Sequence, residues 1–203
     1  AFIPSLSYPA VTQDTNLDSG NTNSNYGSDA SLYVGRSRLS TSNAALRSTA
    51  LIEIDLTNLP LPGTYEVTDA VLDLNAIAVS QDTLISVSAM GSAWSESSTW
   101  SYPSGNNSSW LGTGAYHSAD ADAPFNAAQW VNATGTVSFN VTALLQQALA
   151  SGQTGLNVIL QPEDFNGGVA GRVPFSSSEA SNLAVRPTPN ITYDTPNPWT
   201  ANP

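Results

Sequence analysis

The residue types that usually carry covalent catalysis are scarce in this chain of 203 residues. His117 is the single histidine, and the chain has neither cysteine nor lysine. A catalytic nucleophile activated by a base would therefore have to be a serine that acts with His117 and an acid. His117 stands in the loop-like segment 114–118, where a single histidine is more often a solvated or structural residue. Paired carboxylates such as Glu96 and Glu179 are the remaining candidates, as in glycosidases. We predict that the protein is not an enzyme.

Oxygen donors recur at every second position at the start of the chain, as they do in calcium-binding loops. They are Asp14, Asn16 and Asp18. The glycine that follows, Gly20, is displaced by one position from the calcium-loop pattern, and no Glu stands at the twelfth position. A turn rich in Asn and Asp explains the same residues without a metal. If a metal is present, these hard ligands favour a structural calcium over zinc or copper, and we predict no other cofactor.

Aromatic residues are concentrated between Trp94 and Trp130. Aromatic rings stack on the apolar faces of sugar rings, while polar neighbours bind the hydroxyls. We expect Trp94 to belong to the core and Trp110 to be exposed. The net charge of −11 counts against acidic polysaccharides such as alginate, unless calcium or a local arginine patch intervenes. The candidate carbohydrate-binding residues are Trp100, Tyr102, Trp110 and Trp130.

The two ends of the chain have compositions of their own. Residues 1–9 are apolar and contain two prolines, which predicts an extended arm or an edge strand. Residues 195–203 form a proline-rich extended tail. An apolar arm can add as a strand to an exposed sheet edge of a neighbouring copy, and a head-to-tail contact of this kind tends to give filaments. An arm that folds back on its own domain gives no assembly. The candidate anchors are Phe2, Ile3, Leu6, Tyr8 and Trp199.

Most of the chain between these ends has the alternation of half-buried β-strands. Segments 50–56, 70–76 and 84–89 alternate apolar and polar residues, and the short turns between them predict a meander. Further strands are predicted at 11–17, 31–35, 136–141, 155–160, 172–175 and 190–193. One helix is predicted over 143–150, with Thr142 or Asn140 as its cap and Gly152 as its stop. The predicted fold is all-β: a single jelly-roll-like β-sandwich over residues 10–194, with one short helix and extended terminal arms.

The composition excludes several kinds of partner. Charged residues make up only 10% of the chain, and five arginines face sixteen carboxylates. The resulting negative electrostatic field repels phosphate backbones and anionic lipids, so we expect no nucleic acid partner. No run approaches the ~18 apolar residues of a membrane helix, so we expect no membrane insertion.

The neutral, hydroxyl-rich surface without lysine or cysteine predicts an extracellular or cell-surface protein, with Ala1 left by the removal of a signal peptide. Triplets of the form N-x-[ST] mark candidate glycosylation sites, although a chain rich in Asn, Ser and Thr also produces such triplets by chance. They begin at Asn106, Asn107, Asn132, Asn140 and Asn190.

Seven short motifs follow one another along the chain. They are Asp14-Thr15-Asn16-Leu17; Asn25-Tyr26-Gly27 with Leu32-Tyr33-Val34-Gly35; Ala50 to Leu56 with Leu59-Pro60; Ala70-Val71-Leu72-Asp73-Leu74; Trp94-Ser95-Glu96 with Thr99-Trp100; Val137 to Thr142; and Phe175 to Glu179 with Arg186-Pro187 and Ile191-Thr192-Tyr193. Together they resemble the DNRLRE family of secreted β-sandwich domains, which is similar to a family of carbohydrate-binding modules found beside alginate-degrading enzymes. The resemblance runs from about Ala10 to Tyr193. Asn140 stands where that family usually has Asp.

The resemblance implies a jelly-roll-like sandwich with a non-catalytic role. It also implies that Glu96 and Glu179 are structural and accept hydrogen bonds from the backbone or from arginine, with Arg186 as the expected ion partner. Our leading prediction is a secreted structural subunit that self-assembles into an extracellular filament or surface layer through its terminal segments. Its partners are then further copies of the same chain. The alternative is a carbohydrate-binding module that recognises a polysaccharide through loop aromatics.

Overall fold

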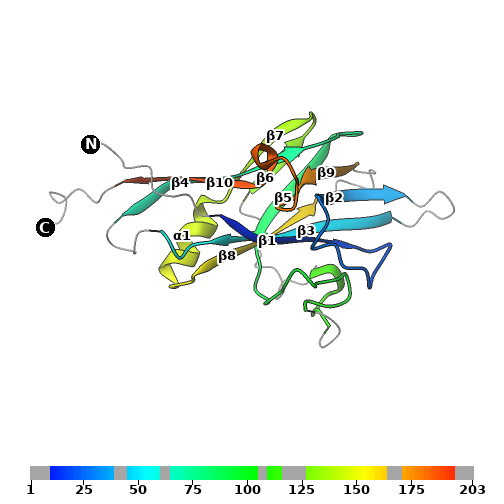
Figure 1. The fold of residues 1–203 in the computed structure, drawn as a ribbon, viewed down its shortest axis with the longest axis horizontal. Helices are drawn as coiled ribbons and strands as arrows, with labels where there is room; N and C mark the ends of the chain where they lie inside the picture. Colours follow the sequence, from blue (N-terminus) through cyan, green and yellow to red (C-terminus); the bar gives the residue numbers. More distant parts are fainter. Residues whose placement is uncertain are drawn as a thin grey trace, which may run out of the picture.

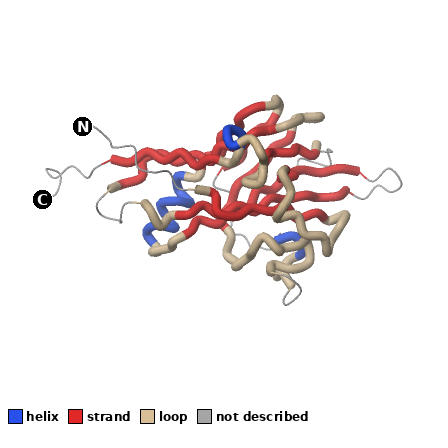
Figure 2. The backbone as a smooth tube through the Cα atoms, in the orientation of Figure 1, coloured by secondary structure: helices blue, strands red, loops and turns tan. Residues whose placement is uncertain are grey.

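The computed structural model describes residues 10–38, 45–59, 65–104, 109–115, 127–163 and 171–194. Within these ranges the regular structure consists of antiparallel strands, one α-helix and two short 3-10 turns (Figures 1 and 2). The strands are β1 (Val11–Asp18), β2 (Ser31–Arg38), β3 (Ala45–Asp55), β4 (Glu66–Ala76), β5 (Thr83–Ala89), β6 (Ala127–Val131), β7 (Gly135–Asn140), β8 (Gly155–Pro162), β9 (Arg172–Ser176) and β10 (Thr188–Asp194). The helix α1 spans Thr142–Ala150, and the 3-10 turns span Thr113–Ala115 and Leu183–Val185.

All ten strands belong to one hydrogen-bonded sheet, which curls over on itself into a sandwich (Figure 1). One layer has the strand order β1-β3-β8-β5-β6. The other layer contains β2, β9 and β4, and β4 carries β10 on one side and β7 on the other. Strand β2 pairs with both β9 and β3, so it connects the two layers. The predicted class, an all-β sandwich with one short helix, is confirmed.

The main core fills the space between the two layers. From β3, Ile52 and Ile54 face inward, and Leu72 of β4 lies in the same apolar cluster. The rings of Phe139 and Phe175 meet edge to face with centroids 6.3 Å apart, an arrangement that aromatic pairs favour. These side chains are almost fully removed from solvent, so the core supplies the hydrophobic stabilisation that holds the layers together.

The helix α1 closes one end of the sandwich. Leu144, Leu145 and Ala148 share its buried face and join the main core. At the start of the helix, the N-cap is Val141, whose side chain makes no capping hydrogen bond, so the predicted cap at Thr142 or Asn140 is wrong. Asn140, the residue before this N-cap, accepts a hydrogen bond through Oδ1 from the backbone N–H of Thr142 at 3.0 Å. At the end, Gly152 adopts a φ of +67° and donates its N–H to the carbonyl of Leu149, which confirms the predicted stop. No helix in the described ranges is long and apolar enough to cross a membrane.

The predicted meander is wrong. Strands β3, β4 and β5 are consecutive in the chain, but none of them pairs with another. β3 pairs with β1, β2 and β8, β4 pairs with β7, β9 and β10, and β5 pairs with β6 and β8. The chain crosses between the two layers after β3 and again after β4. Alternation fixes which side of a strand is apolar, but it carries no information about the partner strand.

The central strand β3 is covered on both faces, which the prediction of a half-buried strand did not foresee. Leu51 points away from the main core, yet it is fully buried. It lies in a second apolar cluster with Ile159 and three tryptophans. These tryptophans come from the described parts of residues 90–115, which we call the tryptophan segment. The segment folds over the outer face of the β1-β3-β8 layer.

Candidate functional site

Several predicted site residues lie outside the described residues. These are the proposed assembly anchors Phe2, Ile3, Leu6, Tyr8 and Trp199, together with His117 and the candidate glycosylation sites Asn106 and Asn107. Of the other candidate glycosylation sites, Asn132 is exposed in the turn between β6 and β7. Asn140 is exposed but accepts a hydrogen bond from the N–H of Thr142, and Asn190 is half-buried and donates to Asp73 Oδ2 at 2.7 Å. Asn132 is therefore the most accessible acceptor among the described residues.

The tryptophans expected to bind sugar have mainly a packing role. The expectation that Trp110 is exposed is wrong, because its side chain is only 5% exposed and its Nε1–H donates to the carbonyl of Thr99 at 2.9 Å. Trp100 is also buried, while Trp94 belongs to the second cluster as predicted. Gly114 has a φ of +71°, and a Cβ there would lie 2.5 Å from the Trp100 ring. Glycine is required at this position so that the segment can close over the ring.

Two of the predicted carbohydrate-binding residues retain accessible surface. Tyr102 is partly exposed in the tryptophan segment. Trp130 is 49% exposed, and it lies in β6 opposite Leu84 rather than in the loop that the sequence suggested. The alternation of apolar and polar residues that marks other strands is weak in β6, and this is why the strand was missed. Trp130 thus offers a ring surface, but Trp100 and Trp110 do not lie beside it as an exposed platform.

The three predicted metal ligands lie in a strand rather than in a loop. Asp14, Asn16 and Asp18 are all in β1, and all are buried. Because residues at every second position of a strand share one face, these side chains point the same way. Asp14 is opposite Ile52, a main-core residue, so the shared face is the inner one. The prediction of a calcium-binding loop is therefore wrong, because these residues form a strand. Their oxygen donors nevertheless lie on one face, as the spacing indicated.

Asp18 is neutralised by an arginine. Its Oδ2 lies 2.9 Å from Arg172 Nη2, and its Oδ1 accepts a hydrogen bond from the N–H of Gly20 at 2.8 Å. The Arg172 guanidinium in turn lies 4.1 Å from the centre of the Tyr33 ring, where a cation–π attraction holds it. Both Asp18 oxygens are thus engaged in structural contacts.

Asp14 instead meets a second carboxyl group. Its Oδ2 accepts a hydrogen bond from the Ser178 N–H at 2.7 Å, and the Ser178 hydroxyl donates to Glu179 Oε1 at 2.7 Å. Burial raises the pKa of Asp14 to about 7, and the neighbouring Glu179 carboxyl adds to this, although the backbone hydrogen bond from Ser178 opposes it. Arg186, the ion partner implied for Glu96 and Glu179, donates its Nε to the carbonyl of Ala180 at 2.8 Å.

A third carboxylate approaches the same region from the tryptophan segment. Burial, and then the charge of Glu179, raises the pKa of Glu96. The backbone around Glu96 is held by Asn25, whose Nδ2 donates to the carbonyl oxygens of Glu96 and Ser98. A Cβ on Gly27 would lie 2.3 Å from the Glu96 carbonyl oxygen, so only glycine fits. Even so, the described residues hold no group of three or more His, Cys, Asp or Glu side chains arranged to bind a metal.

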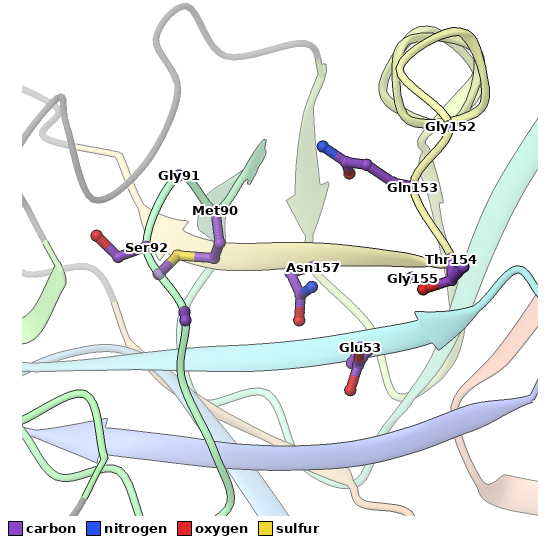
Figure 3. Close-up of a pocket in the computed structure, with 10 residues that line it drawn as sticks. Glu53, Met90, Gly91, Ser92, Gly152, Gln153, Thr154, Gly155 and Asn157 are labelled. Carbon is purple, nitrogen blue, oxygen red and sulfur yellow. The ribbon is translucent and has the colours of Figure 1, made fainter.

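A polar hollow of about 410 Å³ lies on the outer face of the β1-β3-β8 layer (Figure 3). Glu53 of β3 and Asn157 of β8 are cross-strand neighbours and form its floor. Gln153, which follows α1, and Ser92, which follows β5, stand at its sides. Sequence reasoning missed this hollow, because its residues come from segments far apart in the chain.

Glu53 is fixed within the hollow by neighbouring groups. Its Oε2 accepts hydrogen bonds from Gln13 Nε2 at 2.7 Å and from the Thr12 hydroxyl at 3.3 Å. A Cβ on Gly155 would lie 2.7 Å from Glu53 Oε1, so this glycine leaves room for the carboxylate. The hollow thus presents a positioned carboxylate together with side-chain amides. Such groups can bind the hydroxyls of a polar ligand.

The burial of the tryptophans gives a fluorescence prediction. We expect acrylamide to quench native Trp130 efficiently and Trp110 weakly, because quenching requires contact and, among the four tryptophans that the structure describes, only the Trp130 ring is half-exposed. Trp130→Phe should therefore reduce the quenchable fraction of the native emission, whereas Trp110→Phe should increase it. Equal quenching in both variants would contradict this arrangement.

The Asp14 carboxyl predicts a specific dependence of stability on pH. A carboxyl whose pKa is about 7 in the folded state and 3.8 in the reference state stabilises the fold fully below pH 3.8, and this contribution is lost as the pH rises to 7. The loss is on the order of 4 kcal/mol. Asn at position 14 can still accept from Ser178 and can donate to Glu179.

We therefore expect Asp14→Asn, measured by urea unfolding in a chelating buffer, to be more stable than wild type at pH 8, with the difference vanishing near pH 4. Asp69→Asn, which alters an exposed carboxylate, is the matched control. If the free energy of unfolding changes with pH in the same way in wild type and in Asp14→Asn, the Asp14 carboxyl is not the source of the pH dependence.

No protein-family model matches the chain, and no curated protein matches it significantly. The resemblance to the DNRLRE family stays a prediction.

Proposed function

We propose that the protein is a secreted, non-catalytic structural subunit that assembles with further copies of itself through its terminal segments. The observation that carries this proposal is the end of the sandwich at which both termini leave the described fold. Ala10 precedes the start of β1, and Asp194 ends β10. The start of β1 and the end of β10 both lie toward the end of the fold that α1 covers (Figure 1).

Apolar side chains at this end are only partly covered by the described residues. Val11, Tyr65, Leu149 and Ile191 pack against the main core but keep exposed surface. A further apolar segment that docked here would remove this surface from water, which is worth roughly 25 cal/mol per Å². The segment 1–9 has the required composition, with four large apolar residues among its nine.

Strand edges offer the second requirement for such docking. Within the described ranges, β10 pairs only with β4, and β1 pairs only with β3. An edge strand presents unpaired N–H and C=O groups, which an extended segment of a neighbouring copy can bind. Ten strands around a packed core give a rigid body for such a contact, and a contact from one copy to the next propagates into a filament or layer.

The experiment compares the full chain with a variant whose arm is made polar. We expect wild type to form ordered oligomers or filaments as its concentration is raised, as seen by sedimentation velocity and negative-stain electron microscopy. The triple variant Ile3→Ser, Leu6→Ser and Tyr8→Ser should stay monomeric, because its segment no longer gains apolar burial. Ser5→Ala with Ser7→Ala is the control in the same segment and should assemble normally. A monomeric wild type, or assembly unchanged by the triple variant, would refute the proposal.

The polar hollow supports a second candidate function, the binding of a carbohydrate. A carboxylate and two amides converge on it from two separate segments, and sugar hydroxyls both donate and accept hydrogen bonds. This candidate relocates the predicted sugar site from the loop aromatics to the outer face of the β1-β3-β8 layer. Trp130 lies on β6, the far strand of that layer.

A glycan array probed with the full chain tests this candidate. We expect binding to neutral polysaccharides, since the net charge of −11 repels acidic ones. Asn157→Ala should weaken binding about tenfold, the equivalent of one lost hydrogen bond of about 1.4 kcal/mol. Gln129→Ala, an exposed amide on β6, should leave affinity unchanged. The candidate fails if no glycan binds, or if both variants bind as wild type does.

A further inference from the structure

Several buried polar atoms of the described residues have no hydrogen-bond partner, and four of them belong to the carboxyl pair and to its neighbour on β1. These four are Asp14 Oδ1, Glu179 Oε2, and both Oδ1 and Nδ2 of Asn16. Asn16 is fully buried, and it shares the inner face of β1 with Asp14 because it lies opposite Ala50, a main-core residue. Glu179 reaches the same region from the loop that follows β9, where Ser178 bonds to Asp14.

Leaving these atoms without partners is costly. A buried polar group with no hydrogen bond loses its hydration without compensation, and a buried charge loses far more. Native proteins leave few such groups unsatisfied, and each one needs an explanation. Three of the four atoms here are oxygens, so what they lack is a donor or a cation.

Two of the described arginines bind other groups. Arg172 pairs with Asp18 through Nη2, although its buried Nε has no hydrogen-bond partner, and Arg186 donates its Nε to the carbonyl of Ala180. The net charge of −11 also raises the local concentration of cations around the molecule. Both the local geometry and the overall field therefore favour a bound cation.

We propose that Asp14, Asn16 and Glu179 form a binding site for a hard divalent cation, best suited to Ca²⁺. Carboxylate and amide oxygens are the ligands Ca²⁺ prefers, and it tolerates irregular coordination, whereas Mg²⁺ demands a near-octahedral set. The Asn16 side chain binds through Oδ1. Asp18, predicted from sequence as a third ligand, is replaced in this role by Glu179.

A cation at this site connects two parts of the fold that no strand pairing joins. Asp14 and Asn16 belong to β1, at the edge of one layer, and Glu179 belongs to the loop after a strand of the other layer. Binding therefore stabilises the closed sandwich at this edge. The inference is independent of the proposed assembly.

The test uses the full chain after treatment with a chelator. Isothermal titration with calcium chloride should show one site, and the unfolding temperature should rise by about 5–10 °C when free calcium exceeds its Kd about a hundredfold. Asn16→Ala should weaken calcium binding at least tenfold, and Glu179→Gln should abolish it. Asp69→Asn, which removes an exposed carboxylate from β4, should respond to calcium as wild type does. Magnesium chloride should give a smaller shift.

Two results would overturn the proposal. The first is the absence of both a binding heat and a thermal shift in wild type, which would mean that the two carboxyls share a proton instead. The second is a calcium response that persists in Asn16→Ala, which identifies adventitious binding to the acidic surface. If Glu179→Gln fails to fold, Asn16→Ala and wild type still decide between these outcomes.

Discussion

The fold depends on burying β3 on both of its faces. Its inner face carries Ile52 and Ile54 into the core between the layers, and its outer face carries Leu51 into the tryptophan cluster. A sheet with one layer against it would leave the outer face to water. Here the tryptophan segment must fold over that face, and this requirement removes Trp100 and Trp110 from any role as exposed ligand platforms. The hollow around Glu53 lies beside residues 90–93, at the start of the tryptophan segment.

The strands and the helix could be predicted from the sequence because they follow local rules. Alternation marks β3, β4 and β5, and the glycine at position 152 marks the end of α1. The pairing of the strands could not be predicted, because it is decided by non-local packing between layers. Burial of the tryptophans was partly foreseen for Trp94 and wrongly predicted for Trp110, since a polar sequence neighbourhood says little about which distant face a loop covers.

The candidate sites illustrate the same limit. Asp14 and Asn16 attracted attention through their spacing, and they do share one face, but the spacing suggested a loop where the chain forms a strand. The contact of Asp14 with Glu179, which is 165 positions later, left no local signal. The motif residues Asn25, Gly27 and Glu96 also meet near this point. Residues quoted for the family resemblance are thus neighbours in space, and their packing gives a physical reason for the residue types found there.

The tryptophan segment has a consequence for how the molecule opens. Its apolar cluster is separate from the main core, and it lies outside the layer rather than between the layers. Proteins open in cooperative units whose free energies differ, and a peripheral cluster with its own contacts is a natural unit of this kind. Such an opening would uncover Leu17, Leu51 and Ile159 while the sandwich stayed closed. The backbone amides of the segment would then exchange with solvent earlier than those of β3 and β8, which would give the described fold two levels of native-state stability.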